Sequence, residues 1–233
     1  MNQGLIDSVS SLAASEKRLD TIAANIANSS APGFKRQGTS TFSFDAMLGD
    51  RIERRVGTRN IVDYSQGSLK ATEGQYDFAL QGKGFFTVEG KDGELYTRDG
   101  RFYVDDKGVL QTAEGMPVAW EGARGTIDPI GLPIYADTEG TLRQGTQTVG
   151  KLRIVDFERY DQLSAIGGGV FSVPRNVSPT PSVALLRQGQ LEQANVSTID
   201  EMVALINVQR QFESGTRLMQ TIDQSYRRLT TPR

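Results

Sequence analysis

Apolar side chains recur along residues 1–28 on one side of a predicted helix, in steps that alternate between four and three residues. A period near 3.5 residues is typical of a helix that packs along another helix. An ordinary amphipathic helix on its own core would show the same pattern, so both interpretations stay open. The stripe consists of Leu5, Val9, Leu12, Leu19, Ala23 and Ile26, with Ile22 beside it and Glu16 as the single polar break.

The C-terminal segment repeats this rhythm. Thr198 and Glu201 form a possible capping box at the start of a second helix, with Ser197 as a competing cap. Gly215 interrupts the stripe and marks either a close approach of another helix or a slight bend. Each helix is too narrow to build a core alone, so we expect pairing between the two or with neighbouring subunits. The second stripe consists of Leu205, Val208, Phe212, Gly215, Met219, Ile222, Tyr226 and Leu229.

Between the two helices, short apolar runs alternate with turns that contain glycine. Gly93, Gly100, Gly108 and Gly115 stand in the expected turns, where glycine can adopt a positive φ. Regular short strands at this spacing favour an antiparallel all-β domain. The proline-rich stretch 174–182 is expected to be an extended linker to the C-terminal helix. The expected strands are 85–88, 95–98, 102–104, 109–112, 152–157 and 169–174.

These elements predict an α+β fold, in which the N- and C-terminal helices pair as a coiled coil beside a central, mostly antiparallel β domain. The segment between the first helix and the β domain could hold a short helix or strand, and its basic run RIERRV is typical of a solvated edge. The expected parts are the N-terminal helix in 1–36, an extended connecting arm in 37–74, the β domain in 75–195 and the C-terminal helix in 196–233.

The composition excludes several classes of function. The chain has 233 residues, of which 37% are hydrophobic and 23% charged, as in an ordinary globular protein. Its net charge of −2 argues against nucleic acid as a partner, because phosphate binding needs a concentrated basic surface.

No run approaches the roughly 18 apolar residues of a membrane span, so direct membrane insertion is not expected. The start lacks the basic and apolar regions of a secretory signal, so we expect retention in the cell or export without a cleaved signal.

The chain contains no Cys and no His, which removes disulfides, thiolate nucleophiles, Ser-His-Asp triads and the usual zinc ligands. Carboxylates could still serve a glycosidase, but Asp92, Asp99, Asp105 and Asp106 stand at or near glycines in expected turns, where Asp suits the backbone. We therefore predict no enzyme, no cofactor, and no catalytic or metal site. The alternative is a non-catalytic calcium- or glycan-binding β module with helical oligomerisation ends, although the Asp-rich segment does not fit the EF-hand loop.

The stretch ANIANSSAPGFKR, residues 24–36, holds more than a helix stop requires. Pro32 and Gly33 would suffice to end the helix. The two Ala-Asn pairs are left over: small alanines allow close backbone approach, while Asn25 and Asn28 can form hydrogen bonds across a contact. This combination suits a crowded subunit interface better than a free surface.

Three such stretches carry a resemblance to the bacterial flagellar basal-body rod and hook family. The family motif ANNxANxxTPGFKR is matched by AANIANSSAPGFKR, and the central signature by DFALQGKGFFTV and LYTRDGRFYVDDKGVLQTAEGMPV. The C-terminal signature GxLExSNVxxVEEMVxxIxxQRxFE is matched by GQLEQANVSTIDEMVALINVQRQFE. The chain departs from these forms only slightly, at Ala24, Ala31 and Ala194.

The resemblance implies a structural subunit of the periplasmic rod of the basal body. Family members pair their terminal helices in an inner layer around a channel, with a β-rich domain outside, and copies stack helically into a hollow drive shaft that transmits torque from motor to hook. The implied partners are further copies, other rod subunits and the flagellar type III export apparatus. Length and the start MNQGLIDSVSSL favour the proximal over the distal rod protein.

The expected assembly interface combines both apolar stripes with the motif that ends the first helix. Its residues are Leu5, Val9, Leu12, Leu19, Ile22, Ile26, Asn25, Asn28, Pro32, Gly33, Phe34, Leu205, Val208, Phe212, Met219, Ile222 and Tyr226.

Overall fold

The computed structural model describes the backbone of residues 2–48 and 51–230, and the side chains of 10–42, 57–221 and Gln224. The chain divides into two compact units, and both are built from separate stretches of sequence. One, which we call the helical unit, comprises Met1–Ser29, Arg36–Asp63 and Val196–Arg233. The other, the β unit, comprises Ser30–Lys35 and Tyr64–Asn195. The predicted α+β class is confirmed.

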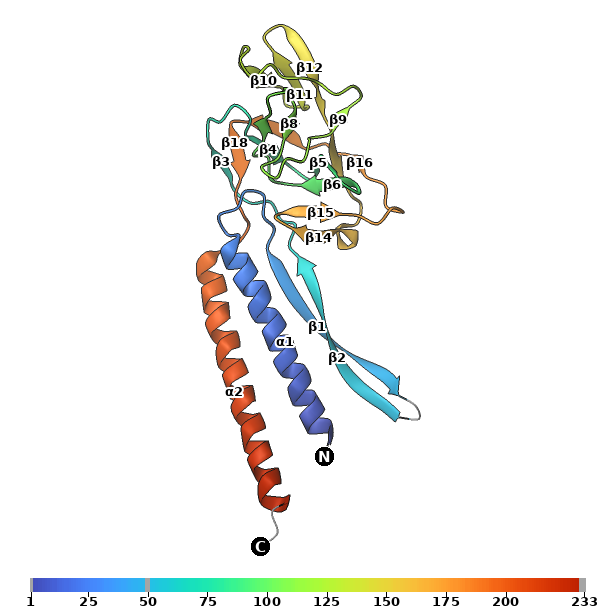
Figure 1. Ribbon diagram of the computed structural model, residues 1–233, viewed down its shortest axis with the longest axis vertical. Helices are drawn as coiled ribbons and strands as arrows, with labels where there is room; N and C mark the ends of the chain where they lie inside the picture. The colour runs from blue at the N-terminus through green and yellow to red at the C-terminus, as the bar shows by residue number, and fades with distance from the viewer. Residues whose placement is uncertain (1, 49–50, 231–233) are drawn as a thin grey trace. The chain divides into compact units, whose positions relative to one another are not determined.

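The helical unit contains two long helices and one hairpin (Figure 1). Helices α1 (Asn2–Ala27) and α2 (Thr198–Thr230) lie side by side and run antiparallel. Strands β1 (Gln37–Leu48) and β2 (Arg51–Val62) pair over their full length and lie along α1. An isolated two-stranded hairpin is marginal in water, so packing on α1 supports it. The expected arm 37–74 therefore begins as a hairpin that groups with the helices.

The ends of both helices follow from local hydrogen bonds. At the end of α1, the amide of Asn28 and its side-chain Nδ2 both donate to the carbonyl of Ala24, at 3.1 and 2.8 Å. At the start of α2, the Ser197 hydroxyl accepts from the amide of Asp200 at 3.4 Å. Ser197 is therefore the cap, and the expected capping box at Thr198 does not form, because the Glu201 carboxylate is engaged elsewhere.

Gly215 marks a close approach between the helices. A Cβ atom at this position would lie 3.1 Å from Cδ2 of Leu12 on α1, closer than side chains usually pack. The helix α2 continues through Gly215 without interruption. The close-approach interpretation is therefore the one that the structure supports.

The β unit is built from short strands, and every pair is antiparallel, as predicted. One sheet has six strands in the order β14-β15-β6-β5-β13-β16, one has four in the order β10-β11-β12-β9, and β17-β4, β18-β3 and β7-β8 form pairs. The strands are β3 Leu69–Ala71, β4 Phe78–Gln81, β5 Phe85–Gly90, β6 Gly93–Thr97, β7 Tyr103–Val104, β8 Leu110–Gln111, β9 Trp120–Glu121, β10 Ile134–Ala136, β11 Thr141–Gln144, β12 Gln147–Leu152, β13 Ile154–Asp156, β14 Ser164–Gly167, β15 Val170–Ser172, β16 Thr180–Pro181, β17 Leu185–Gln188 and β18 Gln190–Glu192. A short 3₁₀ helix, η1, spans Tyr160–Gln162.

Each of the six expected strands overlaps an observed one, but two details differ. Gly93, Gly108 and Gly115 have positive φ as expected, whereas Gly100 does not. Gly100 is needed for space, since a Cβ there would lie 1.8 Å from the carbonyl oxygen of Phe78. The expected linker 174–182 also pairs with β13 through β16, and the chain returns through β17 and β18 before it enters α2.

One hydrophobic core joins the six-stranded and four-stranded sheets. Phe86 of β5 and Leu142 of β11 are both completely buried in it. The single tryptophan, Trp120, belongs to the same core, so its fluorescence reports on the folding of the β unit. Among the helices in the described part of the chain, none is long and apolar enough to cross a membrane.

Candidate assembly site

The outer face of α2 carries an apolar patch that is not part of the predicted stripe. Ile199, Met202, Val203 and Ile206 are 74, 49, 53 and 50% exposed. Their spacing of i, i+3, i+4 and i+7 places them on one side of the helix. This side points away from the stripe that contains Val208, which is 2% exposed. The sequence contains this patch as a second set of apolar positions on the same helix, but the stripe with the more regular spacing was identified instead.

The predicted stripe residues lie mainly where the two helices run together. Ile22 and Val208 are buried, while Leu12, Leu19, Ile26, Leu205, Phe212 and Met219 are half-buried. Side chains of Leu5, Val9, Ile222 and Tyr226 fall outside the described residues. A role of these stripes in contacts between subunits stays a prediction.

Asn25, predicted to bind across a subunit contact, forms its hydrogen bonds within the chain. It is completely buried, and its side-chain amide donates to the carbonyl of Gln37 at 2.7 Å and accepts from the Gln37 amide at 2.9 Å. The same Nδ2 donates to Oε2 of Glu201 at 3.2 Å, and Arg36 Nε lies 2.5 Å from Oε1. Asn25 thus ties the end of α1 to the first hairpin strand and to α2.

A buried charge cluster lies within the β unit around Glu192. Glu192 accepts from Lys35 Nζ at 2.6 Å, from Arg98 at 3.0 Å and from the Gly67 amide at 3.0 Å. The three charged side chains are at most 4% exposed. Two cations against one carboxylate would be costly without further partners, and Lys35 and Arg98 also donate to backbone carbonyls, those of Ser65 and of Gly82.

Residues 30–35 belong to the β unit, and Gly33 packs beside this cluster. Its amide donates to the carbonyl of Glu192 at 2.7 Å, and its φ is +67°. A Cβ at this position would lie 2.2 Å from the carbonyl carbon of Arg98. Only glycine fits, and the neighbouring Phe34 is then buried with it. Pro32 is half-buried at the start of this segment.

The cluster around Glu192 joins the three stretches that carried the family resemblance. Lys35 belongs to the N-terminal motif, Arg98 to the central signature and Glu192 to the C-terminal signature. Sequence reasoning placed Gly33 and Phe34 in the interface but did not find the ion pairs. Opposite charges in separate motifs were visible, but the pairing between them depends on the fold.

The acidic residues considered for catalysis have local roles. Asp105 Oδ1 accepts from the amides of Lys107 and Val109, and Asp99 Oδ1 accepts from the amide of Arg101. Burial raises the pKa of Asp99, although its contacts with Arg101 oppose the shift. These bonds are those of Asp in tight turns, as the sequence predicted.

Comparison with known families matches three parts of the chain. Residues 8–35 match the family described as "Flagella basal body rod protein". Residues 79–144 match "Flagellar hook protein FlgE/F/G D1 domain", and residues 187–231 match "Flagellar basal body rod FlgEFG protein C-terminal". The matched segments include Lys35, Arg98 and Glu192, one in each.

Curated relatives extend this likeness over nearly the whole chain. The flagellar basal-body rod protein FlgF of Caulobacter vibrioides is 33% identical over 87% of this chain and 86% of its own length. FlgF of Mesorhizobium japonicum is 34% identical, covering 94% and 92%. The rod protein FlgG of Bacillus subtilis is 28% identical, covering 96% of each. The chain therefore belongs to the flagellar basal-body rod proteins, a structural and non-enzymatic family of rod subunits.

Proposed function

We propose that this rod subunit meets its neighbours through the outer apolar face of α2, while α1 and α2 pair as an antiparallel coiled coil within the subunit. The coiled coil is supported by the 3.5-residue period and by the close approach of Leu12 to Gly215. The face is supported by its exposure, since an apolar helix face open to water is typical of an interaction site.

The single observation that carries this proposal is the confinement of the patch to two helical turns. Beyond Ile206, the same side of α2 continues with Arg210, Glu213 and Arg217, so apolar character ends sharply. A free helix surface has no need of four adjacent apolar side chains. A partner helix in the next subunit would cover them.

We further propose that the helices form the inner layer of a hollow, helically stacked shaft and that the β unit lies outside it. The two stripes and the motif around Pro32 take part in this packing, as the family resemblance implies. The proximal position in the rod is supported by the FlgF relatives and by the start of the sequence. Delivery by the type III export apparatus is what the family resemblance implies.

The test is a charge placed on the outer face. Met202→Asp and Ile206→Asp should abolish motility and incorporation into isolated rods, because each buries a carboxylate in the proposed contact. Gln211→Asp, at an exposed position on another side of α2, is the matched control and should leave both unchanged. The Trp120 unfolding transition should be the same in all three variants.

Leu12→Asp and Met219→Asp test the pairing of α1 with α2 separately from the outer face of α2. Both should lose incorporation through disrupted pairing of α1 with α2, with the β unit still folded. Normal motility of the outer-face variants would refute the proposed face, and normal motility of the pairing variants would refute the coiled coil.

A further inference from the structure

The outer apolar face of α2 contains one side chain that an oxidant can modify. Met202 is 49% exposed, and its neighbours on this face, Ile199, Val203 and Ile206, are 74, 53 and 50% exposed. The aliphatic side chains of isoleucine and valine resist oxidation, whereas the thioether of methionine is readily converted to a sulfoxide. The face therefore carries a single reactive group among inert ones.

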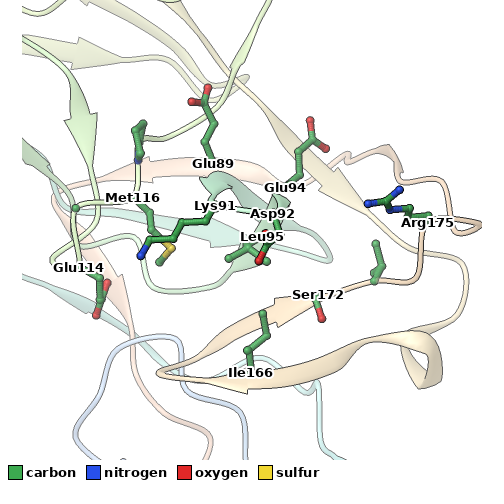
Figure 2. A pocket seen from close by; sticks show the side chains of 15 residues that line it. Glu89, Lys91, Asp92, Glu94, Leu95, Glu114, Met116, Ile166, Ser172 and Arg175 are labelled. Carbon is green, nitrogen blue, oxygen red and sulfur yellow. The ribbon is translucent and has the colours of Figure 1, made fainter.

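Met202 is also the most exposed of the methionines whose side chains the structure describes. These are Met116, Met202 and Met219, while the side chains of Met1 and Met47 lie outside the described residues. Met116 is half-buried, lines a groove of the β unit and packs against the core of that unit (Figure 2). Met219 is half-buried in the stripe of α2. An oxidant in solution should therefore reach Met202 first.

The modification needs only a peroxide and no catalytic group. The sulfur lone pair of Met202 attacks one oxygen of hydrogen peroxide, the O–O bond breaks and an S–O bond forms. The hydroxide that leaves takes the proton from the oxygen on sulfur and departs as water. The sulfur is oxidised and the peroxide is reduced. An apolar thioether thus becomes a polar sulfoxide with a strong hydrogen-bond acceptor.

A sulfoxide at this position does not suit an apolar contact. The side chains of Ile199, Val203 and Ile206 have no hydrogen-bond donor to offer it. A buried acceptor without a donor is costly, so the oxidised face binds an apolar partner less well than the reduced face. In the free subunit the same group is open to water, which supplies the donor. Oxidation should therefore weaken the contact and leave the fold of the free chain intact.

We propose that Met202 is an oxidation-sensitive site, at which peroxide controls the entry of the free subunit into the rod. The inference rests on the proposed function, in which the outer face of α2 is the contact with the next subunit. Before assembly the thioether is open to the oxidant, and its sulfoxide keeps the subunit out of the rod. After assembly the contact covers the thioether, so the finished rod is protected.

The test compares Met202 with a second thioether introduced on the same helix. Leu218 is 56% exposed and lies outside the outer face, so Leu218→Met provides a reference of similar exposure within the same molecule. Cells that express this full-length variant receive a short pulse of hydrogen peroxide, the peroxide is removed, and the rods assembled afterwards are isolated. Mass spectrometry gives the sulfoxide fraction at both positions, in these rods and in the free subunits.

We expect the Met202 sulfoxide to be about tenfold rarer in the new rods than in the free subunits, because an unpaired buried acceptor disfavours the contact. The sulfoxide of the introduced reference should be equally frequent in both. Met202→Leu keeps a large apolar side chain, so it should assemble normally and make assembly resistant to the pulse. Met116→Leu removes a thioether elsewhere and is the matched control, which should stay as sensitive as the unmodified chain.

Equal fractions of Met202 sulfoxide in rods and in free subunits would overturn the inference. A loss of assembly in Met202→Leu as large as in the unmodified chain would also overturn it. If Met202→Asp still blocks incorporation in either case, the proposed outer face stands and only its control by oxidation is wrong. If Met202→Asp enters rods normally, the outer face itself is refuted, and the oxidation-sensitive site with it.

Discussion

At the scale of single residues, Glu192 pairs with two buried cations of the β unit. Lys35 reaches it from before the hairpin, and Arg98 reaches it from the end of β6. Arg98 also lies over the ring of Phe85, 5.4 Å from its centroid. Arg98 therefore contacts both the carboxylate of Glu192 and the aromatic ring of Phe85.

Glu192→Ala should destabilise the β unit by about 3–5 kcal/mol, because it leaves two buried cations without their carboxylate. Trp120 fluorescence during urea unfolding measures the change. Glu121→Ala removes an ion pair with Lys151 in which both partners are about 40% exposed, and should cost about 0–1 kcal/mol. Equal effects of the two substitutions would contradict the importance of the buried cluster.

The buried Tyr64 makes the β unit lose stability at alkaline pH. Burial raises its pKa to about 12, against about 10 in an unfolded chain. Below pH 10 the hydroxyl is neutral in both states. Between about pH 10 and 12 the unfolded chain releases the proton while the folded one keeps it, so stability falls as pH rises. Burial also raises the pKa of Tyr160, which adds to the same loss.

Tyr64→Phe should therefore weaken the loss of stability above pH 10. It should also raise stability at pH 7 by about 1 kcal/mol, because the buried Tyr64 hydroxyl has no hydrogen-bond partner in the described part of the chain. Tyr103→Phe, at a half-exposed position, is the control and should change neither quantity. Urea unfolding at pH 7 and pH 11 separates the two effects, and a less stable Tyr64→Phe at both values would contradict this account.

At the scale of elements, α2 has two apolar faces with different contacts. One face packs on α1 around Val208 and Gly215, and the other exposes the patch from Ile199 to Ile206. A helix with apolar residues on opposite sides needs two partners. Helix α1 covers one side of α2, whereas the patch from Ile199 to Ile206 is exposed in the described part of the chain.

Gly215→Leu should force α1 and α2 apart, because even a Cβ there lies 3.1 Å from Leu12. Amide protons of α1 should then exchange faster in the free chain, since a long helix without its partner is marginal. Ser214→Leu places the same side chain at the neighbouring exposed position and should leave exchange unchanged. Unchanged protection of α1 in Gly215→Leu would show that the helices need no close approach here.

At the scale of the whole molecule, adjacent residues serve different units. Lys35 belongs to the β unit and pairs with Glu192, whereas Arg36 belongs to the helical unit and pairs with Glu201. The motif that ends α1 therefore contributes to both units. This explains why it contains more than a helix stop: Asn25 ties α1 to the hairpin and α2, and Gly33 enters the β unit.

The sequence by itself determined the elements with strong local signals. Periodic apolar positions identified both helices, and glycine turns between apolar runs identified the central antiparallel strands. The three motifs identified the family, and with it the structural, non-enzymatic role in the basal-body rod, which the relatives confirm.

Only the tertiary structure decided which distant residues meet. The pairing of Lys35 and Arg98 with Glu192, the hydrogen bonds of Asn25 and the clearance at Gly33 join positions up to 176 residues apart, and no local pattern encodes them. The sequence left the segment after the first helix open between a short helix and a strand, and the pairing of Gln37–Leu48 with Arg51–Val62 was not predicted, because the support of the hairpin comes from α1. Local propensity specifies a segment, whereas burial and charge pairing depend on what the rest of the chain brings beside it.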